Sequence, residues 1–175
     1  MDGVIQTQRL IIRELALTDA KAFYQLNSDL DVLKYTGDLP FESIDHARDF
    51  LKNYTAYKQY GYGRWAVVLK DSNRFIGWCG LKYNEDNLVD LGFRFFKSFW
   101  SKGYATESAL ACLHYGFNDL GIHEIIGRSA TDNKASIRVL EKLGMLFWKH
   151  HPCKGINDAV YYKITKQQFE EKKND

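Results

Sequence analysis

The apolar and polar positions of this chain change their period several times, and each change predicts a new structural element. Apolar side chains at every second position predict strands over residues 9–15, 64–69, 75–82, 89–96, 124–130, 146–151 and 159–164. Apolar side chains at helical spacing predict helices over residues 18–26, 43–60, 105–120 and 134–143, with a further turn at 29–35. The pattern is typical of a mixed α/β (α+β) protein.

Capping residues support these boundaries. Small polar residues that suit a helix N-cap occur at the starts of three helices: Thr18-Asp19, Ser43 and Thr165. Glycines that suit the left-handed position after a helix follow three of them: Gly61, Gly121 and Gly144. Thr165 with Gln168 also forms a candidate capping box, which predicts a last short helix.

Length and composition then limit the number of domains and the classes of function. With 175 residues, 45% of them hydrophobic, the chain can bury one substantial core, and we expect a single domain over residues 1–175. A formal net charge of +2 is too balanced to predict binding to nucleic acid or to an anionic membrane. No apolar run approaches the roughly 18 residues that span a bilayer. We therefore expect a cytoplasmic protein.

Cysteines and histidines do not form a recognisable metal site or disulfide framework. The three cysteines Cys79, Cys112 and Cys153 are an odd number and lie far apart in the sequence. His150, His151 and Cys153 have the residue types of a metal site, but neighbouring residues of a strand point to opposite faces. We expect no metal cofactor.

One stretch between a predicted strand and a predicted helix has the features of an anion site. Residues 99–107 read FWSKGYATE. Free N–H groups and the positive end of the helix dipole meet at such a helix start. Gly103 allows a phosphate to approach the backbone, Ala105 leaves the entrance open, and Lys102 adds positive charge. A plain strand-to-helix connection would have the same composition, so the surrounding motifs decide between the two.

Those motifs resemble the GNAT superfamily of acetyltransferases, which carries Q/R-x-x-G-x-G/A in this position. Here the run is Trp100 to Ala105, WSKGYA, with Trp in place of Gln or Arg. The branch that it resembles most, the ribosomal-protein N-acetyltransferases (RimJ/RimL-like), has a similar run that contains KGYATE. Further similar segments are TQRLIIREL at 7–15, FIGWCGL at 75–81, DLGFR at 90–94 and NKASIRVLEKLGM at 133–145.

The resemblance implies a GNAT fold, a central twisted mixed sheet with a splayed parallel strand pair flanked by helices. The strand at 90–95 would carry a bulge and separate from the strand at 124–130, and acetyl-CoA would enter the gap as a co-substrate. Backbone groups of Phe93 and Phe95 would bind its pantetheine arm. Asn133 would hold the arm from the other side. The pyrophosphate would take N–H groups from the loop residues Ser101, Lys102, Gly103, Tyr104, Ala105 and Thr106.

Direct attack of an amine on a thioester requires a proton acceptor and a proton donor for the leaving thiolate. Asp90, at the start of the splayed strand, is the candidate acceptor, and a solvated strand-end carboxylate is the alternative interpretation. A positioned water or Glu85 would replace it. Many family members place a Tyr donor where this chain has Leu140, which leaves Ser136 as the candidate donor or as an ordinary helix residue.

The acceptor is not encoded in any pattern that we can read. The resemblance points to a protein or peptide N-terminal amine, and a small amine such as a polyamine is the alternative. A catalytically silent acyl-CoA-binding or sensor domain, an enzyme that uses another acyl-CoA, and a homodimer all stay open. The chain has no G-x-x-x-x-G-K-[ST] run and no G-x-G-x-x-G run after its first strand, which argues against a kinase or a dehydrogenase.

Overall fold

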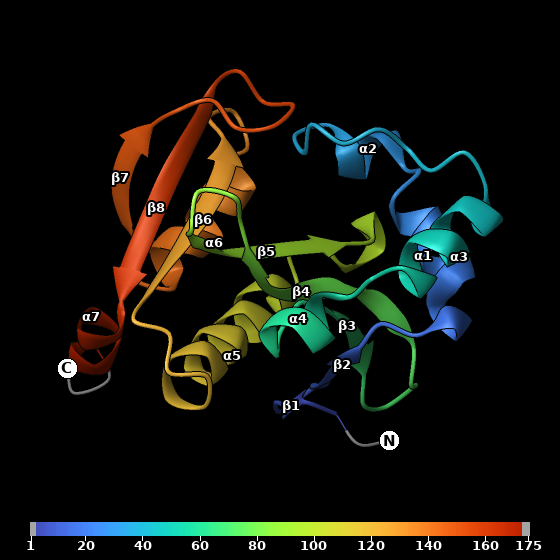
Figure 1. Ribbon diagram of the computed structural model, residues 1–175, viewed down its shortest axis with the longest axis horizontal. Helices are drawn as coiled ribbons and strands as arrows, with labels where there is room; N and C mark the ends of the chain where they lie inside the picture. The colour runs from blue at the N-terminus through green and yellow to red at the C-terminus, as the bar shows by residue number, and fades with distance from the viewer. Residues whose placement is uncertain (1–2, 173–175) are drawn as a thin grey trace.

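The computed structural model describes residues 3–172, whose eight strands form one mixed sheet (Figure 1). The strands are β1 (Ile5–Gln6), β2 (Leu10–Glu14), β3 (Arg64–Leu69), β4 (Phe75–Tyr83), β5 (Val89–Phe95), β6 (Glu124–Ala130), β7 (Leu146–His150) and β8 (Ala159–Thr165). Their order across the sheet is β1-β2-β3-β4-β5-β6-β8-β7. Every neighbouring pair is antiparallel except β5 and β6, which are parallel.

The helices confirm most of the predicted periods. They are α1 (Ala20–Leu26), α2 (Leu30–Leu33), α3 (Ile44–Lys52), α4 (Ala56–Tyr60), α5 (Tyr104–Asn118), α6 (Lys134–Lys142) and α7 (Lys166–Glu171), with 3₁₀ turns at Leu17–Asp19 and Lys97–Phe99. The predicted caps Ser43 and Thr165 accept hydrogen bonds from the first turns of α3 and α7. None of these helices is long and apolar enough to cross a membrane.

Two sequence predictions for the first half of the chain are wrong. The single helix expected over 43–60 divides into α3 and α4, with a break at residues 53–55. Asp19 is not a side-chain cap for α1, because its carboxylate instead binds the guanidinium of Arg13 at 2.8 Å and the N–H of Ala16 at 2.8 Å. Asp19 is buried, and the ion pair with Arg13 replaces the water that its carboxylate loses on burial.

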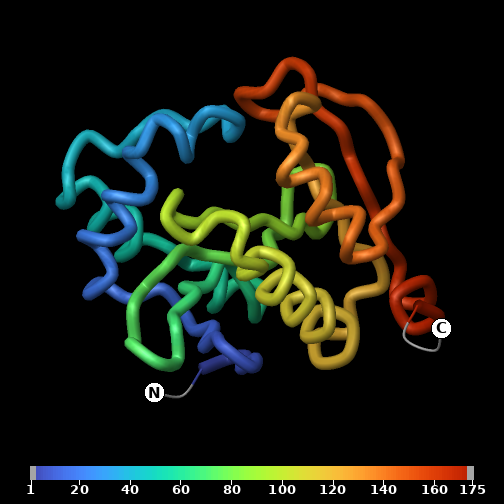
Figure 2. Tube along the Cα trace, turned by 180° about the vertical axis from the view of Figure 1, so that it is seen from behind, coloured from blue at the N-terminus to red at the C-terminus, as the bar shows by residue number. Residues whose placement is uncertain are grey.

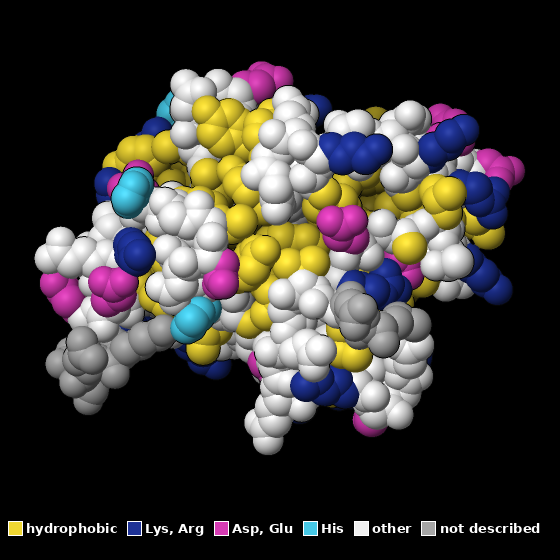
Figure 3. Space-filling model, turned by 60° about the horizontal axis from the view of Figure 1, so that its bottom comes forward, with side chains coloured by type: hydrophobic (Ala, Val, Ile, Leu, Met, Phe, Trp, Pro, Cys, Tyr) yellow, Lys and Arg dark blue, Asp and Glu magenta, His cyan; other side chains and the backbone are white. Residues whose placement is uncertain are grey.

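Helices cover both faces of the sheet. On one face α5 lies under β4 and β5, and the main hydrophobic core there includes Trp65, Leu81, Leu91 and Phe117. On the other face α1 and α3 form a smaller cluster with Phe75 and Trp78 of β4 partly buried against it. Figure 3 shows the underside of the molecule, where apolar side chains gather in the middle and charges of both signs are interspersed around them.

The parallel pair β5 and β6 separates after a short contact. Only Asp90↔Ile126 and Leu91↔Gly127 are paired, although each strand has seven residues. The bulge expected in residues 90–95 is not found, because β5 pairs with β4 in one unshifted register from Val89 to Phe95. The gap therefore arises because β5 follows β4 while β6 follows β8, without any extra residue in β5.

Two loops from distant parts of the sequence meet across the open side of the sheet. Figures 1 and 2 both show the segment after α2 beside the loop between β7 and β8. Gly37 and Gly155 form the contact, since a Cβ placed on Gly155 would lie 2.3 Å from the carbonyl oxygen of Gly37. A side chain on either residue would push these loops apart.

The start of β2 is tied to the first turn of α5 by the carboxylate of Glu107. Thr7 Oγ1 donates to Glu107 Oε1 at 2.6 Å and Arg9 Nε donates to Oε2 at 2.6 Å. Arg9 Nη1 also donates to the carbonyl oxygen of Lys102 at 3.0 Å, and its guanidinium lies over the Tyr104 ring at 4.3 Å. These contacts fix the loop that precedes α5.

We predict that Glu107→Gln lowers the free energy of unfolding at pH 7 by about 1–2 kcal/mol, because it removes charge-assisted hydrogen bonds. Partial burial opposes ionisation, but hydrogen bonds from Thr7 and Arg9 hold the pKa of Glu107 below its ordinary value of 4.5. This stabilisation is present above the unfolded-state pKa and is lost as the pH falls through the lower folded-state pKa. Denaturant unfolding at pH 7 and near pH 3 measures the free energy of unfolding of wild type and variant at each pH.

The difference between wild type and Glu107→Gln should therefore shrink toward pH 3. Glu170→Gln is the control, because Glu170 is exposed and lies 3.9 Å from Lys166. It should leave the stability at pH 7 nearly unchanged. If Glu107→Gln lowers the free energy of unfolding equally at both pH values, the charge of the Glu107 carboxylate does not provide the stabilisation.

Candidate active site

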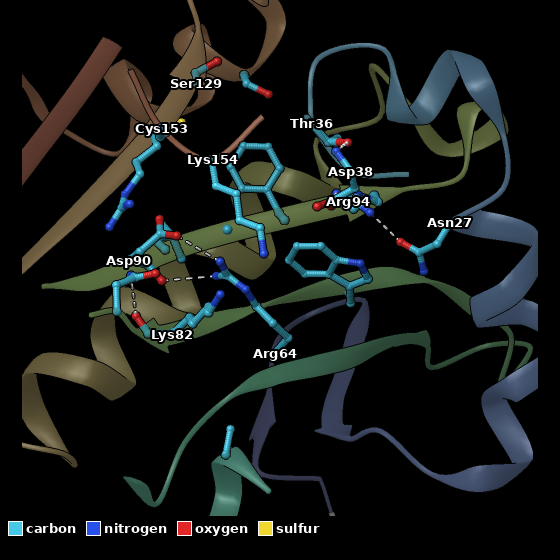
Figure 4. A pocket seen from close by; sticks show the side chains of 18 of the residues that line it. Asn27, Thr36, Asp38, Arg64, Lys82, Asp90, Arg94, Ser129, Cys153 and Lys154 are labelled. Carbon is cyan, nitrogen blue, oxygen red and sulfur yellow. Dashed lines mark hydrogen bonds and ion pairs between the residues drawn. The ribbon is translucent and has the colours of Figure 1, made fainter. Parts of the chain in front are cut away.

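A cavity of about 650 Å³ opens on the face of the sheet opposite α5 (Figure 4). Its floor comes from β3, β4 and β5, and one wall comes from α1 and the segment that follows α2. The opposite wall comes from β6, α6 and the loop between β7 and β8. The cavity thus joins the gap between β5 and β6 to the two loops that meet at Gly37 and Gly155.

Gly92 makes room for an arginine on the cavity floor, and Gly80 beside it allows the backbone of Gly63 and Arg64 to approach β4 closely. Gly80 of β4 and Gly92 of β5 face each other in the ladder, and Arg64 of β3 pairs with Gly80. A Cβ placed on Gly92 would lie 2.6 Å from Arg64 Nη1. The guanidinium of Arg64 therefore lies across the sheet, with its centre 5.1 Å from the Trp78 ring centroid.

Arg64 binds the carboxylate of Asp90. Its Nη2 donates to Asp90 Oδ2 at 3.0 Å, and its Nη1 donates to the carbonyl oxygens of Gly80 at 2.7 Å and Asp90 at 3.1 Å. The side chains of Arg64 and Asp90 are 16% and 14% exposed. Asp90 is thus not a freely solvated strand-end carboxylate, since a partly buried ion pair fixes it at the cavity floor.

Arg94 occupies the far side of Trp78. Its Nη1 donates to Asn27 Oδ1 at 2.5 Å and its Nη2 to Asp38 Oδ2 at 2.6 Å, while its guanidinium lies 5.2 Å from the Trp78 ring. Burial lowers the pKa of Arg94 despite the opposing contribution of Asp38. This arginine links β5 to α1 and to the segment after α2, so it positions one wall of the cavity.

The free edge of β5 faces the gap toward β6. The N–H of Phe96 bonds the carbonyl of Ile76 in β4 at 3.1 Å. Alternation in an antiparallel ladder therefore turns the peptide groups of Phe93 and Phe95 the other way, toward the gap. The carbonyl of Phe95 accepts the indole N–H of Trp100 at 2.8 Å. This bond ties the strand end to the next loop and gives Trp100 a structural role at the motif position that departs from the family pattern.

The predicted phosphate loop lies at the start of α5, outside the residues that line the cavity. Gly103 is the N-cap of α5 in the left-handed conformation, with φ +81°, and Ser101 also has positive φ at 59°. Two such residues curl the backbone before the helix. The first N–H groups of α5 have no partner within the helix, so Ser101, Lys102, Gly103, Tyr104, Ala105 and Thr106 surround a set of backbone donors.

Asn133 and Ser136 lie together where β6 passes into α6. Asn133 Oδ1 caps the helix by accepting from Ser136 N at 3.2 Å, and Asn133 Nδ2 donates to Ser136 Oγ at 3.0 Å. Within residues 3–172 the hydroxyl proton of Ser136 has no acceptor of its own. Both residues line the cavity, on the side of the gap opposite Phe93.

The structure therefore brings Asp90, Phe93, Asn133 and Ser136 to one cavity, while Phe95 is buried and the loop before α5 lies beyond the cavity wall. Glu85 does not line it. Sequence reasoning missed Trp78 and Arg94, which form an aromatic and arginine layer together with Arg64. A signal was present in the sequence, because Arg64, Trp78 and Arg94 lie on the same face of β3, β4 and β5 as Gly80 and Gly92.

No group of three or more His, Cys, Asp or Glu side chains in residues 3–172 is arranged to hold a metal ion. Cys79 and Cys112 face each other in the core, with their Sγ atoms 3.7 Å apart, and both are fully buried. His151 Nδ1 lies 2.7 Å from the carbonyl oxygen of Pro152, its own neighbour.

Comparison with known proteins identifies the family. The family described as "Acetyltransferase (GNAT) domain" matches residues 9–146. The N-acetyltransferase YnaD of Bacillus subtilis (strain 168), itself uncharacterized, is 34% identical over 94% of this chain and 98% of its own length. The uncharacterized N-acetyltransferase p20 of Bacillus licheniformis is 27% identical over 94% of this chain and 97% of its own length.

Solved structures show the same fold. A GNAT-family acetyltransferase from Bacillus anthracis superposes with a TM-score of 0.79 at 32% identity, over 93% of this chain and 98% of that one. A spermidine N-acetyltransferase from Vibrio cholerae, in complex with CoA and spermine, has a TM-score of 0.79 at 20% identity, over 94% of this chain and 99% of that one. The chain thus belongs to the GNAT family of acetyltransferases and is an acetyl-CoA-dependent N-acetyltransferase.

Proposed function

We propose that this enzyme transfers the acetyl group of acetyl-CoA to a primary amine that enters the cavity over Arg64 and Trp78. The observation that carries the proposal is the gap between β5 and β6. Residues on both sides of this gap, Asp90 to Arg94 of β5 with Arg128 and Ser129 of β6, line the cavity, and Phe95 at the end of β5 is bonded to Trp100 just before the donor-rich loop. A cofactor that follows the free edge of β5 by strand addition spans these two places.

In this arrangement the loop Ser101 to Thr106 holds the pyrophosphate, and backbone groups of Phe93 and the N–H of Phe95, whose carbonyl is bound by Trp100, bind the pantetheine arm. Asn133 contacts the arm from α6. The thioester then lies near the point where β5 and β6 meet, between Asp90 and Ser136. The amine nitrogen attacks the carbonyl carbon, a new C–N bond forms, and the C–S bond breaks to release CoA thiolate.

Two side chains then have roles in proton acceptance and hydrogen-bond donation. We assign Asp90 as the acceptor of the amine proton, through the carboxylate oxygen that Arg64 does not bind. Ser136 donates a hydrogen bond to the leaving sulfur, since its hydroxyl proton is free to turn toward the gap. A free α-amine has a pKa of about 7.7–8.0 and a lysine amine of about 10.4, so the base matters less for an N-terminal acceptor.

The acceptor that we favour is the N-terminal amine of a protein or peptide, as in the RimJ/RimL-like branch. The loops at residues 35–41 and 153–156 both line the cavity and touch at Gly37 and Gly155. We further propose a cytoplasmic location. A homodimer is compatible with the exposed edge strand β7, where Leu146 and Phe147 are 57% and 53% exposed.

For the cofactor site we predict that Gly103→Val weakens acetyl-CoA binding at least about tenfold, or about 1.4 kcal/mol, measured by calorimetry. A branched side chain would stand where the phosphate approaches the backbone. It would also be strained at φ +81° and would approach Arg9 Nη2, which lies 3.3 Å from an ideal Cβ.

Gly121→Val is the matched control for that strain. Gly121 follows the other end of α5, has φ +67° and has open space around an added Cβ. It should lower stability by a similar amount and leave acetyl-CoA affinity unchanged. Equal affinities for Gly103→Val and wild type, in folded protein, would remove the pyrophosphate from this loop.

At the start of α6 we predict that Asn133→Ala weakens acetyl-CoA binding, whereas Ser136→Ala lowers kcat by roughly 10- to 100-fold with little change in binding. Ser136→Thr, which keeps the hydroxyl, should recover most of the rate. Steady-state kinetics and calorimetry separate the two effects. If Ser136→Ala keeps the wild-type kcat, or Asn133→Ala keeps the wild-type affinity, the corresponding role is wrong.

For the base we predict that Asp90→Asn lowers kcat by roughly a hundredfold near neutral pH. The loss should shrink as the pH rises, because more of the acceptor amine is already neutral. The pH–rate profile and acetyl-CoA affinity are the measurements, and affinity should hardly change.

Arg64→Gln separates a base from a structural partner. If Asp90 acts only by holding Arg64, then Arg64→Gln should reproduce the rate loss of Asp90→Asn at every pH. If Asp90 takes the proton, Arg64→Gln should keep the wild-type pH dependence. Release of free thiol from acetyl-CoA with a panel of amines would at the same time exclude a silent binding domain.

A further inference from the structure

The cavity over the sheet carries more positive than negative side chains. Its charged lining residues are Arg64, Lys82, Arg94, Arg128, Lys154, Asp38 and Asp90. Five of these are cationic and two are anionic. The excess is local, because the whole chain has a net charge of only +2. The loop that we assign to the pyrophosphate does not line the cavity, so that anion is not the reason for the excess.

The three arginines are already neutralised by partners on the protein. Arg64 binds Asp90, Arg94 binds Asp38, and Arg128 Nη2 lies 3.3 Å from Asp86 Oδ2. Both carboxylates of the cavity are used in these pairs. Neither carboxylate therefore offers an unpaired negative charge to a cationic substrate group.

The two lysines are different, because neither Lys82 nor Lys154 has a side-chain hydrogen bond or ion pair within residues 3–172. Lys82 is the cross-strand neighbour of Asp90, so its side chain leaves the same face of the sheet. Figure 4 shows Lys154 reaching down from the β7–β8 loop into the cavity, toward Arg64 and Asp90. The next residue, Gly155, packs against Gly37, which holds this loop over the cavity.

We propose that the acceptor carries an anionic group, a carboxylate or a phosphate, close to the amine that is acetylated, and that Lys154 and Lys82 bind this group. The proposal rests on the function proposed above, since it assigns the acceptor of that same site. Asp90 would face the amine while the two ammonium groups face the anion. A polyamine would instead bring a second cation against two unpaired lysines.

The test uses matched amines that differ only in the anion. Glycyl-glutamate amide is compared with glycyl-glutamine amide, and O-phosphoethanolamine with ethanolamine, with spermidine as the polycation. Binding to the CoA-saturated enzyme is measured by calorimetry, and kcat/KM by thiol release. We expect the anionic member of at least one pair to be favoured about tenfold or more. The pair that shows the preference identifies carboxylate or phosphate.

Charge reversal locates the preference. Lys154→Glu should remove it or reverse it, and Lys82→Ala should reduce it, while the neutral amines and acetyl-CoA bind as before. Lys21→Glu makes the same change of net charge on an exposed position of α1 that does not line the cavity, and it should leave the preference intact. The preference should also weaken as salt is raised.

The outcomes separate this inference from the proposed function. Equal binding of anionic and neutral members, tighter binding of spermidine, or a preference that survives Lys154→Glu overturns the anionic acceptor even if acetyl transfer is fast. A preference that Lys154→Glu abolishes, in an enzyme that releases no thiol with any amine, supports the anion site and overturns catalysis.

Discussion

The separation of the parallel strands β5 and β6 is the constraint on which the site depends. Each strand follows a different antiparallel partner, β4 or β8, and each packs with a different helix, α5 or α6. Gly127 of β6 contributes to this, because a Cβ there would lie 2.6 Å from the Leu140 side chain of α6. With only two residue pairs joining them, the strands leave an edge of free peptide groups inside the protein. Such groups are costly unless a ligand or water binds them.

The sheet that forms the floor of the cavity beyond this gap has two facing positions without side chains, Gly80 and Gly92. Gly80 allows the backbone of Gly63 and Arg64 to pack close to β4, and Gly92 leaves room for the Arg64 guanidinium to lie across the strands, where it binds Asp90 and lies beside Trp78. A larger residue at position 92 would lift the guanidinium and move Asp90 with it. The carboxylate nearest to the gap is thus held by backbone shape as much as by charge.

Much of the fold could be predicted from the sequence, because period and capping report local structure. The break after α3 could not be predicted, because Tyr54 and Tyr57 keep the apolar spacing of a continuous helix. Their hydroxyls bind the backbone of Arg64, and Tyr57 also binds Leu15, so tertiary hydrogen bonds override the local period. The pairing of Arg64 with Asp90 on the cavity floor could not be predicted either, because the two residues are 26 positions apart and meet only through strand register.

The first turn of α5 shows how an anion site can contain a carboxylate of its own. Glu107 sits where the helix dipole favours negative charge, and alone it would compete with a phosphate for that field. Arg9 and Thr7 bind both of its oxygens, while Arg9 also holds the carbonyl of Lys102. The carboxylate is thereby used to anchor the loop, and the N–H groups before it stay available. The segments TQRL and KGYATE, far apart in the sequence, therefore form one structural unit. A substitution in either segment should displace the backbone of the other.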